Sequence, residues 1–191
     1  MNILFLIMKL KKKLEKAFKR VAQRLFILLH GKIYILKKNN NLKIEIKKVS
    51  QIFINNKKFK TNNYLYEIKD ARIYTDLNEH VSIIKNHHII PKISFQHIKG
   101  VLRNIKHNRA LEEGTPYFIK EFKGIIFSLV QGGSSNNYFH FLFDIITRLR
   151  ILQEFYNLNE IDYFYINRKI NWQIKFLNFF FKIPYKKLLF A

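Results

Sequence analysis

The 191-residue sequence contains no cysteine, which excludes a disulfide framework and a thiolate metal site. It also lacks a long apolar run near its start. The first such run, Ile3 to Met8, is far shorter than the roughly 20 residues that cross a bilayer. Basic residues follow this run rather than precede it, and no small-residue cleavage site is present, so it does not resemble a signal peptide. We therefore expect a cytoplasmic protein.

Acidic residues are few: 13 Asp and Glu stand against 35 Lys and Arg, giving a formal net charge of +22. Residues 1–60 hold 17 basic and 2 acidic residues, a charge of +15, whereas residues 61–191 hold 18 and 11, a charge of +7. The basicity therefore belongs mainly to the N-terminal third. Lys, Asn, Ile and Phe are all abundant, so a bias toward AT-rich codons is an alternative source of the charge outside residues 1–30. With 48% hydrophobic residues, the chain can still form a substantial core.

Residues 1–30 predict a basic amphipathic helix. From Leu10 to Leu28 the apolar residues recur at steps of three and four, while eight Lys and Arg between Lys9 and Arg24 cover the remaining surface. Such a helix is typical of proteins that bind an anionic membrane surface, and we assign this role to residues 9–29. Docking of the helix on its own domain and binding to nucleic acid are the alternatives.

Residues 31–115 predict a β-rich region of short strands at 32–36, 42–49, 51–54, 71–75, 81–85 and 88–93. Asn-rich turns separate several of these runs, and Asn86-His87 is the predicted turn of a hairpin. The interval 57–63 is polar, and residues 97–116 are polar and irregular, so we expect no strands in either segment. The histidines at 80, 87, 88, 97 and 107 have no ligand spacing with carboxylates, and we expect no metal site.

Residues 116–191 predict an incomplete α/β domain. Gly124–Val130 is a continuous apolar run, which predicts a strand buried on both faces. A helix from the Ser134–Asn136 region to about Tyr156, a strand at 162–166, a helix at 171–181 and a strand at 187–190 follow. Alternating strands and helices indicate a parallel sheet. The pattern stops at Ala191 in mid-course, so we expect part of a larger α/β protein.

The segment GGSSNNYFHFLFDIITRLR, residues 132–150, carries polar side chains at helical spacing. At about 100° per residue they fall on one stripe of a helix that is otherwise apolar. The stripe contains Asn136, His140, Asp144 and Thr147, with Arg148 at its border. Because unpaired burial of polar groups is costly, the stripe must face a cleft or pair with itself. The glycines match neither a phosphate-binding P-loop nor a dinucleotide-binding motif.

Spacing leaves two interpretations of this stripe open. His140 and Asp144 are four residues apart, so the carboxylate can orient the imidazole as in a general base. Arg148 could neutralise Asp144 or hold a ligand, and the amides of Asn136 and Asn137 lie where a helix N-terminus favours a polar or anionic group. The alternative is a His–Asp–Arg chain that satisfies its own hydrogen bonds inside the core.

This segment resembles the signature of glycosyltransferase family 61, which includes bacterial capsular-polysaccharide biosynthesis proteins. The family shows a strand, then Asn-Tyr-x-His-Trp, one or two hydrophobic residues, Asp, and Leu-Pro-Arg-Leu. Two positions differ here, since Phe141 replaces the Trp and Ile146-Thr147 replaces Leu-Pro. The resemblance extends over about residues 70–190. The matching residues are Asn137, Tyr138, His140, Asp144, Arg148 and Leu149.

The resemblance implies the N-terminal Rossmann-like half of a GT-B-type glycosyltransferase, preceded here by short β-strands and a basic amphipathic helix. Such enzymes are inverting, take a nucleotide-sugar donor and a glycan acceptor as substrates, and use no metal or other cofactor. His140 and Asp144 are then the catalytic candidates, and Asn136, Asn137, Tyr138 and Arg148 the substrate-binding ones. The donor-binding motifs have no counterpart, so we expect a fragment that is inactive by itself.

We therefore expect a glycosyltransferase of surface or capsular polysaccharide biosynthesis, cytoplasmic or peripheral on the inner face of the cell membrane. The alternative function is a basic, non-catalytic module that binds nucleic acid or another anionic polymer. The aromatic residues speak against nucleic acid, because they cluster in apolar runs rather than alternating with Lys and Arg. A truncated relative that serves as a partner subunit is a third reading.

Overall fold

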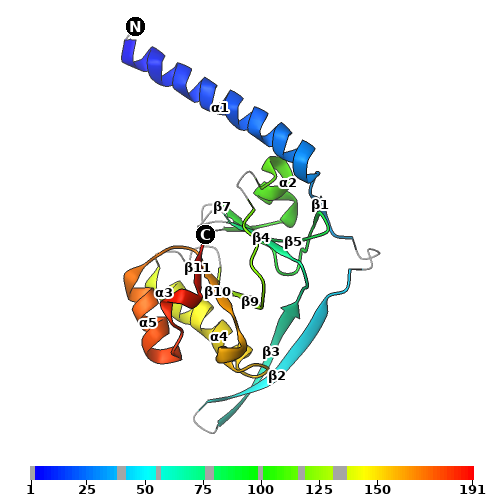
Figure 1. Cartoon of the computed structure of the whole chain (residues 1–191), viewed down its shortest axis with the longest axis vertical. Coiled ribbons are helices and arrows are strands. Elements are labelled where there is room, and N and C mark those ends of the chain that lie inside the picture. The colour runs from blue at the N-terminus through cyan, green and yellow to red at the C-terminus, as the bar shows by residue number, and fades with distance from the viewer. Residues whose placement is uncertain are drawn as a thin grey trace.

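The computed structural model describes residues 3–37, 42–54, 57–75, 80–98, 101–115, 119–130 and 137–191. Within these residues a long helix leads into two antiparallel-rich sheets and then into a small parallel sheet with its helices (Figure 1). The fold class is therefore mixed α/β, as the sequence predicts.

The N-terminal helix α1 (Ile3–His30) confirms the predicted helix and also includes the apolar residues that precede Leu10. It projects away from the rest of the molecule and meets it only near its C-terminal end, beside α2 (Arg109–Glu113) (Figure 1). Among the described residues, none of the helices combines the length and the apolar character that crossing a membrane requires.

A six-stranded sheet follows α1. Its strand order is β1-β6-β5-β7-β8, and β4 also pairs with β5. The predicted hairpin is confirmed, since β5 and β6 pair antiparallel around Asn86 and His87, both of which have positive φ angles. The bounds are β1 (Tyr34–Ile35), β4 (Arg72–Thr75), β5 (His80–Lys85), β6 (His88–Ile89), β7 (Phe95–Ile98) and β8 (Val101–Arg103).

The strands β2 (Glu45–Ile54) and β3 (Lys57–Glu67) form a separate antiparallel ribbon, which extends from the body on the side opposite α1 (Figure 1). The two predicted runs at 42–49 and 51–54 are one strand with an irregularity between Val49 and Gln51. The prediction that 57–63 contains no strand is wrong. Since this half of the ribbon is exposed on both faces, its pairing needs no alternation of apolar and polar residues.

The prediction of an irregular segment at 97–116 is also wrong in part. The segment includes the end of β7, the strand β8, the short helix η1 (Ile105–His107) and α2. Asn108 organises this region: its buried side chain accepts from the Ala110 N–H at the start of α2 and from the Ser82 hydroxyl on β5. A contact between residues 26 positions apart is not visible in local sequence.

The C-terminal α/β unit contains the predicted parallel sheet, and its strand order is β11-β10-β9. The helices between its strands pack on one another, because the ring of Phe141 contacts Trp172 and Phe176 of α5. The bounds are β9 (Ile126–Ser128), α3 (Tyr138–His140), η2 (Phe141–Ile146), α4 (Thr147–Leu152), η3 (Leu158–Glu160), β10 (Tyr163–Ile166), α5 (Asn171–Phe181), η4 (Tyr185–Lys187) and β11 (Leu188–Phe190).

The prediction that the strand at 124–130 is buried on both faces is wrong for β9 itself. Its three residues are half-buried, because β9 forms an edge of the three-stranded sheet. Burial is complete only after the strand, at Leu129 and Val130. Phe164 on the central strand β10 is fully buried, and it lies at the centre of the core that the helices cover.

Candidate functional site

The site lies on the helix of residues 138–152, which we call the site helix. It begins as α3, continues as the π-helical segment η2, and ends as α4. The sequence predicts a regular α-helix up to about Tyr156, which is wrong in both respects: the helix ends at Leu152 and its middle is wound with i→i+5 hydrogen bonds. π-helical turns are rare, and many of them lie at functional sites.

The apolar side of the site helix fixes it on the parallel sheet. Four of its residues are at most 3% exposed, and they pack with Phe164 of β10 and Leu177 of α5 in one core. The four are Phe141, Ile145, Leu149 and Leu152. Burial of each such side chain contributes about 2 kcal/mol, so this side is firmly held while the opposite side carries the polar residues.

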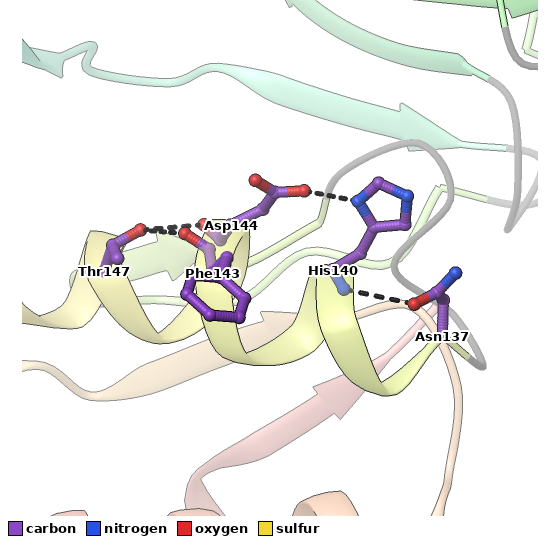
Figure 2. A network of polar contacts seen from close by, with 5 residues as sticks. All are labelled: Asn137, His140, Phe143, Asp144 and Thr147. Carbon is purple, nitrogen blue, oxygen red and sulfur yellow. Dashed lines mark hydrogen bonds and ion pairs between the residues drawn. The ribbon is translucent and has the colours of Figure 1, made fainter.

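His140 and Asp144 are in direct contact. The imidazole Nδ1 lies 2.6 Å from Asp144 Oδ2, and Figure 2 shows the two side chains turned toward each other on one side of the helix. Both are accessible, with the side chains 41% and 30% exposed. Because a carboxylate accepts hydrogen bonds, Nδ1 is the donor of this bond. The second ring nitrogen, Nε2, then has its lone pair available to accept a proton.

The alternative interpretation, a polar stripe that satisfies its own hydrogen bonds inside the core, does not match the structure. The His140–Asp144 pair reaches solvent, and Thr147 is exposed and donates to the backbone oxygen of Phe143 at 2.7 Å. Of the two interpretations that spacing leaves open, the arrangement favours an accessible pair over a buried one. An accessible pair can meet a ligand, which a buried pair cannot.

The two asparagines at the start of the helix have different outcomes. Asn137 is the N-cap residue, and its side-chain oxygen accepts from the His140 N–H at 3.2 Å (Figure 2). Its carbonyl group is therefore engaged by the helix, and it positions His140 rather than standing free for a substrate. The predicted ligand residue Asn136 lies outside the described residues.

Arg148 is within the electrostatic influence of Asp144, in line with one of the two roles that the sequence suggested for it. Its Nη1 donates to the Val130 carbonyl oxygen at 3.1 Å, which ties the site helix to the chain just after β9. Burial lowers the pKa of Arg148 from its ordinary value, and the charge of Asp144 opposes this shift. Arg148 therefore supplies positive potential near Asp144 and fixes the end of β9.

Tyr138, the other predicted substrate-binding residue, is 61% exposed. Its ring lies 5.2 Å from that of Trp172 on α5, so it joins the N-termini of two helices. Near it, Phe139 and Phe143 stack at 4.5 Å while each remains about 60% exposed. An exposed aromatic surface therefore adjoins the His140–Asp144 pair, and sequence reasoning did not identify it as such.

Sequence reasoning also missed a polar cluster at the other end of the site helix. Lys47 on β2 donates to Tyr156 at 2.9 Å and pairs with Glu67 on β3 at 2.6 Å, while Tyr156 donates to Glu67 at 2.5 Å. Hydrogen bonding to Glu67 raises the pKa of both Lys47 and Tyr156. Local sequence holds no signal for this cluster, because its members lie on two strands and in the loop after the site helix. The cluster fastens the ribbon to the α/β unit. Tyr156 also lines an open depression that residues 153–160, Phe181 and Lys182 form.

In the part of the chain that the structure describes, no three His, Asp or Glu side chains come together in a way that could hold a metal ion. Comparisons with known proteins give no match of the chain to a family model, a curated protein or a solved structure. The site therefore stands on its own geometry: an accessible, oriented imidazole beside a carboxylate, on a rigidly packed helix that follows a parallel strand.

Proposed function

We propose that the chain forms the acceptor-side half of an inverting glycosyltransferase similar to family 61, with a GT-B arrangement and a role in surface or capsular polysaccharide synthesis. The observation that carries the proposal is the 2.6 Å contact between His140 Nδ1 and Asp144 Oδ2 in an accessible position. These are the two residues that the resemblance makes catalytic.

The place of the pair in the fold supports the proposal. His140 lies in the first turn of the helix that follows β9, and the strands of this sheet are parallel. In open parallel α/β sheets, ligands bind beyond the carboxyl ends of the strands, where the connecting loops and helix N-termini begin. His140 and Asp144 are therefore at the edge where a substrate of such a fold is expected.

The chemistry that the pair can perform is general-base catalysis. As an acceptor hydroxyl oxygen attacks the anomeric carbon of the donor sugar, Nε2 of His140 takes the hydroxyl proton. The bond between that carbon and the nucleoside diphosphate breaks, and the leaving group carries away the electron pair. Attack from the side opposite the leaving group inverts the configuration. Asp144 orients the ring and stabilises the imidazolium cation that forms.

The aromatic residues beside the pair suit a sugar acceptor. Phe139 and Phe143 present exposed ring surface next to His140, and the apolar faces of sugar rings pack on aromatic side chains. Asn137 and Arg148 are engaged with the protein backbone, so we assign them a positioning role. In the proposed enzyme the nucleotide belongs to the other Rossmann-like half.

The test uses the protein purified from the cells that naturally produce it. It measures the release of nucleoside diphosphate from a panel of nucleotide sugars. We expect His140→Ala and Asp144→Ala to lower kcat about 100-fold or more, the usual contribution of a general base. His107→Ala, at an exposed histidine far along the chain, is the matched control and should leave kcat unchanged. Unaltered turnover in both site variants, with unaltered unfolding curves, would contradict the proposed roles. Failure of all donors to react would contradict the proposed activity itself.

A further inference from the structure

The free length of α1 lacks any packing partner within the described chain. From Leu6 to Val21 every residue is exposed, which amounts to more than four helical turns. The exposed apolar side chains in α1 include Phe18 at 74%, Leu28 at 81% and Leu29 at 75%. A helical segment of about this length is marginal in water unless an apolar face is covered. The exposed stripe therefore indicates a surface that another body covers.

The body of this protein cannot cover the stripe, because α1 docks through its opposite side. Phe26 is the docked residue: it is 7% exposed, Arg72 lies over its ring, and Gln23 donates to the Glu112 carbonyl oxygen on α2. At about 100° per residue, Phe26 lies roughly 160° from Leu10 around the helix. The docked face also includes Ala22, Ile27 and His30, all partly buried.

The two faces of the free length differ in chemistry. The apolar residues at 10, 14, 18, 21, 25 and 28 lie within about 80° of one another, and Lys11, Lys13 and Arg24 flank them. Five further basic residues occupy the other side, where Glu15 is the single acidic residue of the helix. Basic residues four positions apart repel one another, so this face requires a source of negative charge.

The positions of the stripe argue against a second copy of the chain as its partner. From Leu10 onward the steps of the stripe are 4, 4, 3, 4 and 3 residues. A coiled-coil seam alternates steps of 4 and 3, so it would contain Ala17 and Arg24 in place of Phe18 and Leu25. Nucleic acid would neutralise the basic face and leave the apolar stripe in water. A bilayer with anionic headgroups covers the apolar stripe and also places negative charge beside the basic residues that flank it.

We propose that α1 lies on an anionic lipid bilayer, with the stripe of Leu10, Leu14, Phe18, Val21, Leu25 and Leu28 among the acyl chains. Lys11, Lys13 and Arg24 then lie at the level of the phosphates, and the other five basic residues of the helix lie above them in the negative potential of the surface. Since its docked face points the other way, the helix can stay attached to the body through Phe26 while the stripe enters the bilayer. The inference is independent of the proposed transferase activity.

The test is co-sedimentation of the full chain with vesicles of phosphatidylcholine, with and without phosphatidylglycerol. We expect binding to the anionic vesicles that falls as salt rises, together with a gain in helical circular dichroism. Leu14→Gln/Phe18→Gln should weaken binding at least about tenfold through loss of apolar contact. Lys12→Gln/Lys16→Gln should weaken it about tenfold or more through loss of charge. The matched control, Lys58→Gln/Lys60→Gln on the basic ribbon, should bind as the parent does.

Three outcomes would overturn the inference. One is a failure of the parent chain to bind anionic vesicles. Another is a dimer in sedimentation equilibrium that Leu14→Gln/Phe18→Gln abolishes while vesicle binding is unchanged. The third is tight binding to duplex DNA that needs Lys12 and Lys16, combined with vesicle binding that is indifferent to the apolar variant. Because Gln keeps good helix propensity, circular dichroism of each variant separates these results from loss of the helix.

Discussion

The helix α1 and the site helix follow from the same kind of sequence pattern, yet they end in opposite environments. Both have apolar residues at steps of three and four. In the site helix, Leu149 and Leu152 are almost completely buried between the sheet and α5, whereas Leu14 and Phe18 of α1 are more than 60% exposed. The periodicity of a sequence therefore identifies a stripe and its direction, but not the body that covers it.

The polar residues of the two helices show the same contrast between groups with partners in the chain and groups without a described balance of charge. In the site helix His140 and Asp144 pair with each other, and Arg148 reaches the backbone of Val130. In α1 eight Lys and Arg share the surface with one acidic residue, Glu15. The polar groups of the site helix find their partners within the chain. An excess of one charge, as in α1, indicates an external partner of the opposite charge.

The largest expected effect is the change in the free energy of unfolding when a leucine of an apolar stripe is replaced by alanine. Leu149→Ala removes a fully buried side chain and should lower the free energy of unfolding by about 2–5 kcal/mol. Leu14→Ala removes a side chain that is 63% exposed and should change it by about 0.5 kcal/mol or less. Urea unfolding of the two variants measures the contrast. Equal destabilisation would mean that α1 packs on protein, and the comparison would then fail.

The fold was predictable wherever local pattern decides it. The alternation of strands and helices after residue 119, the bounds of α5 and the Asn86-His87 hairpin all follow from apolar runs and turn residues. The strand β3 was not predictable, because an exposed ribbon gives residues such as Asn62 and Asn63 no apolar alternation. The π-helical winding of η2 was likewise invisible, since nothing in FLFDII differs in period from an ordinary helix.

The second prediction concerns how α1 is attached. Gly114 has a positive φ of 67°, and a Cβ there would lie 2.9 Å from the Phe26 ring. Gly114→Ala should therefore cost about 1–3 kcal/mol through backbone strain and displacement of Phe26. Native-state hydrogen exchange should locate the loss in α1 and α2 while the site helix keeps its protection. An equal loss of hydrogen-exchange protection in α1 and in the site helix would show that α1 does not open as a separate unit.

The third prediction tests why the site helix keeps its exposed pair. Because His140 and Asp144 are 41% and 30% exposed, solvent screens their attraction, and Asp144→Ala should change the free energy of unfolding by less than about 1 kcal/mol. Chemical denaturation with Thr147→Ala as a control on the same side of the helix measures this. A loss as large as that of Leu149→Ala would assign the pair to structure and weaken its proposed catalytic role.

The pair itself was predictable from sequence, because residues four apart on a helix meet regardless of the surrounding fold. Its neighbours were not. The side chain of Asn137 caps the helix, and Arg148 donates to the Val130 carbonyl oxygen. Both contacts depend on how the chain enters the helix after β9. The cluster of Lys47, Glu67 and Tyr156 depends on a ribbon that packs against the far end of the site helix.

The smallest expected effect comes from that cluster, which fastens the chain just beyond the site helix. Desolvation alone would raise the pKa of Glu67, but its hydrogen bonds with Lys47 and Tyr156 outweigh this and hold the pKa below the ordinary value of 4.5. A lowered folded pKa stabilises the fold above pH 4.5, and this stabilisation is lost as the pH falls through the lower value. Between about pH 5 and 3, the parent should lose slightly more stability than Glu67→Gln, whereas Glu121→Gln, at an exposed position, should follow the parent. Urea midpoints at several pH values measure the difference. An equal loss in Glu67→Gln and in the parent would mean that the ribbon is held to the site helix by its apolar contacts, in the way that Phe26 holds α1, and not by this carboxylate.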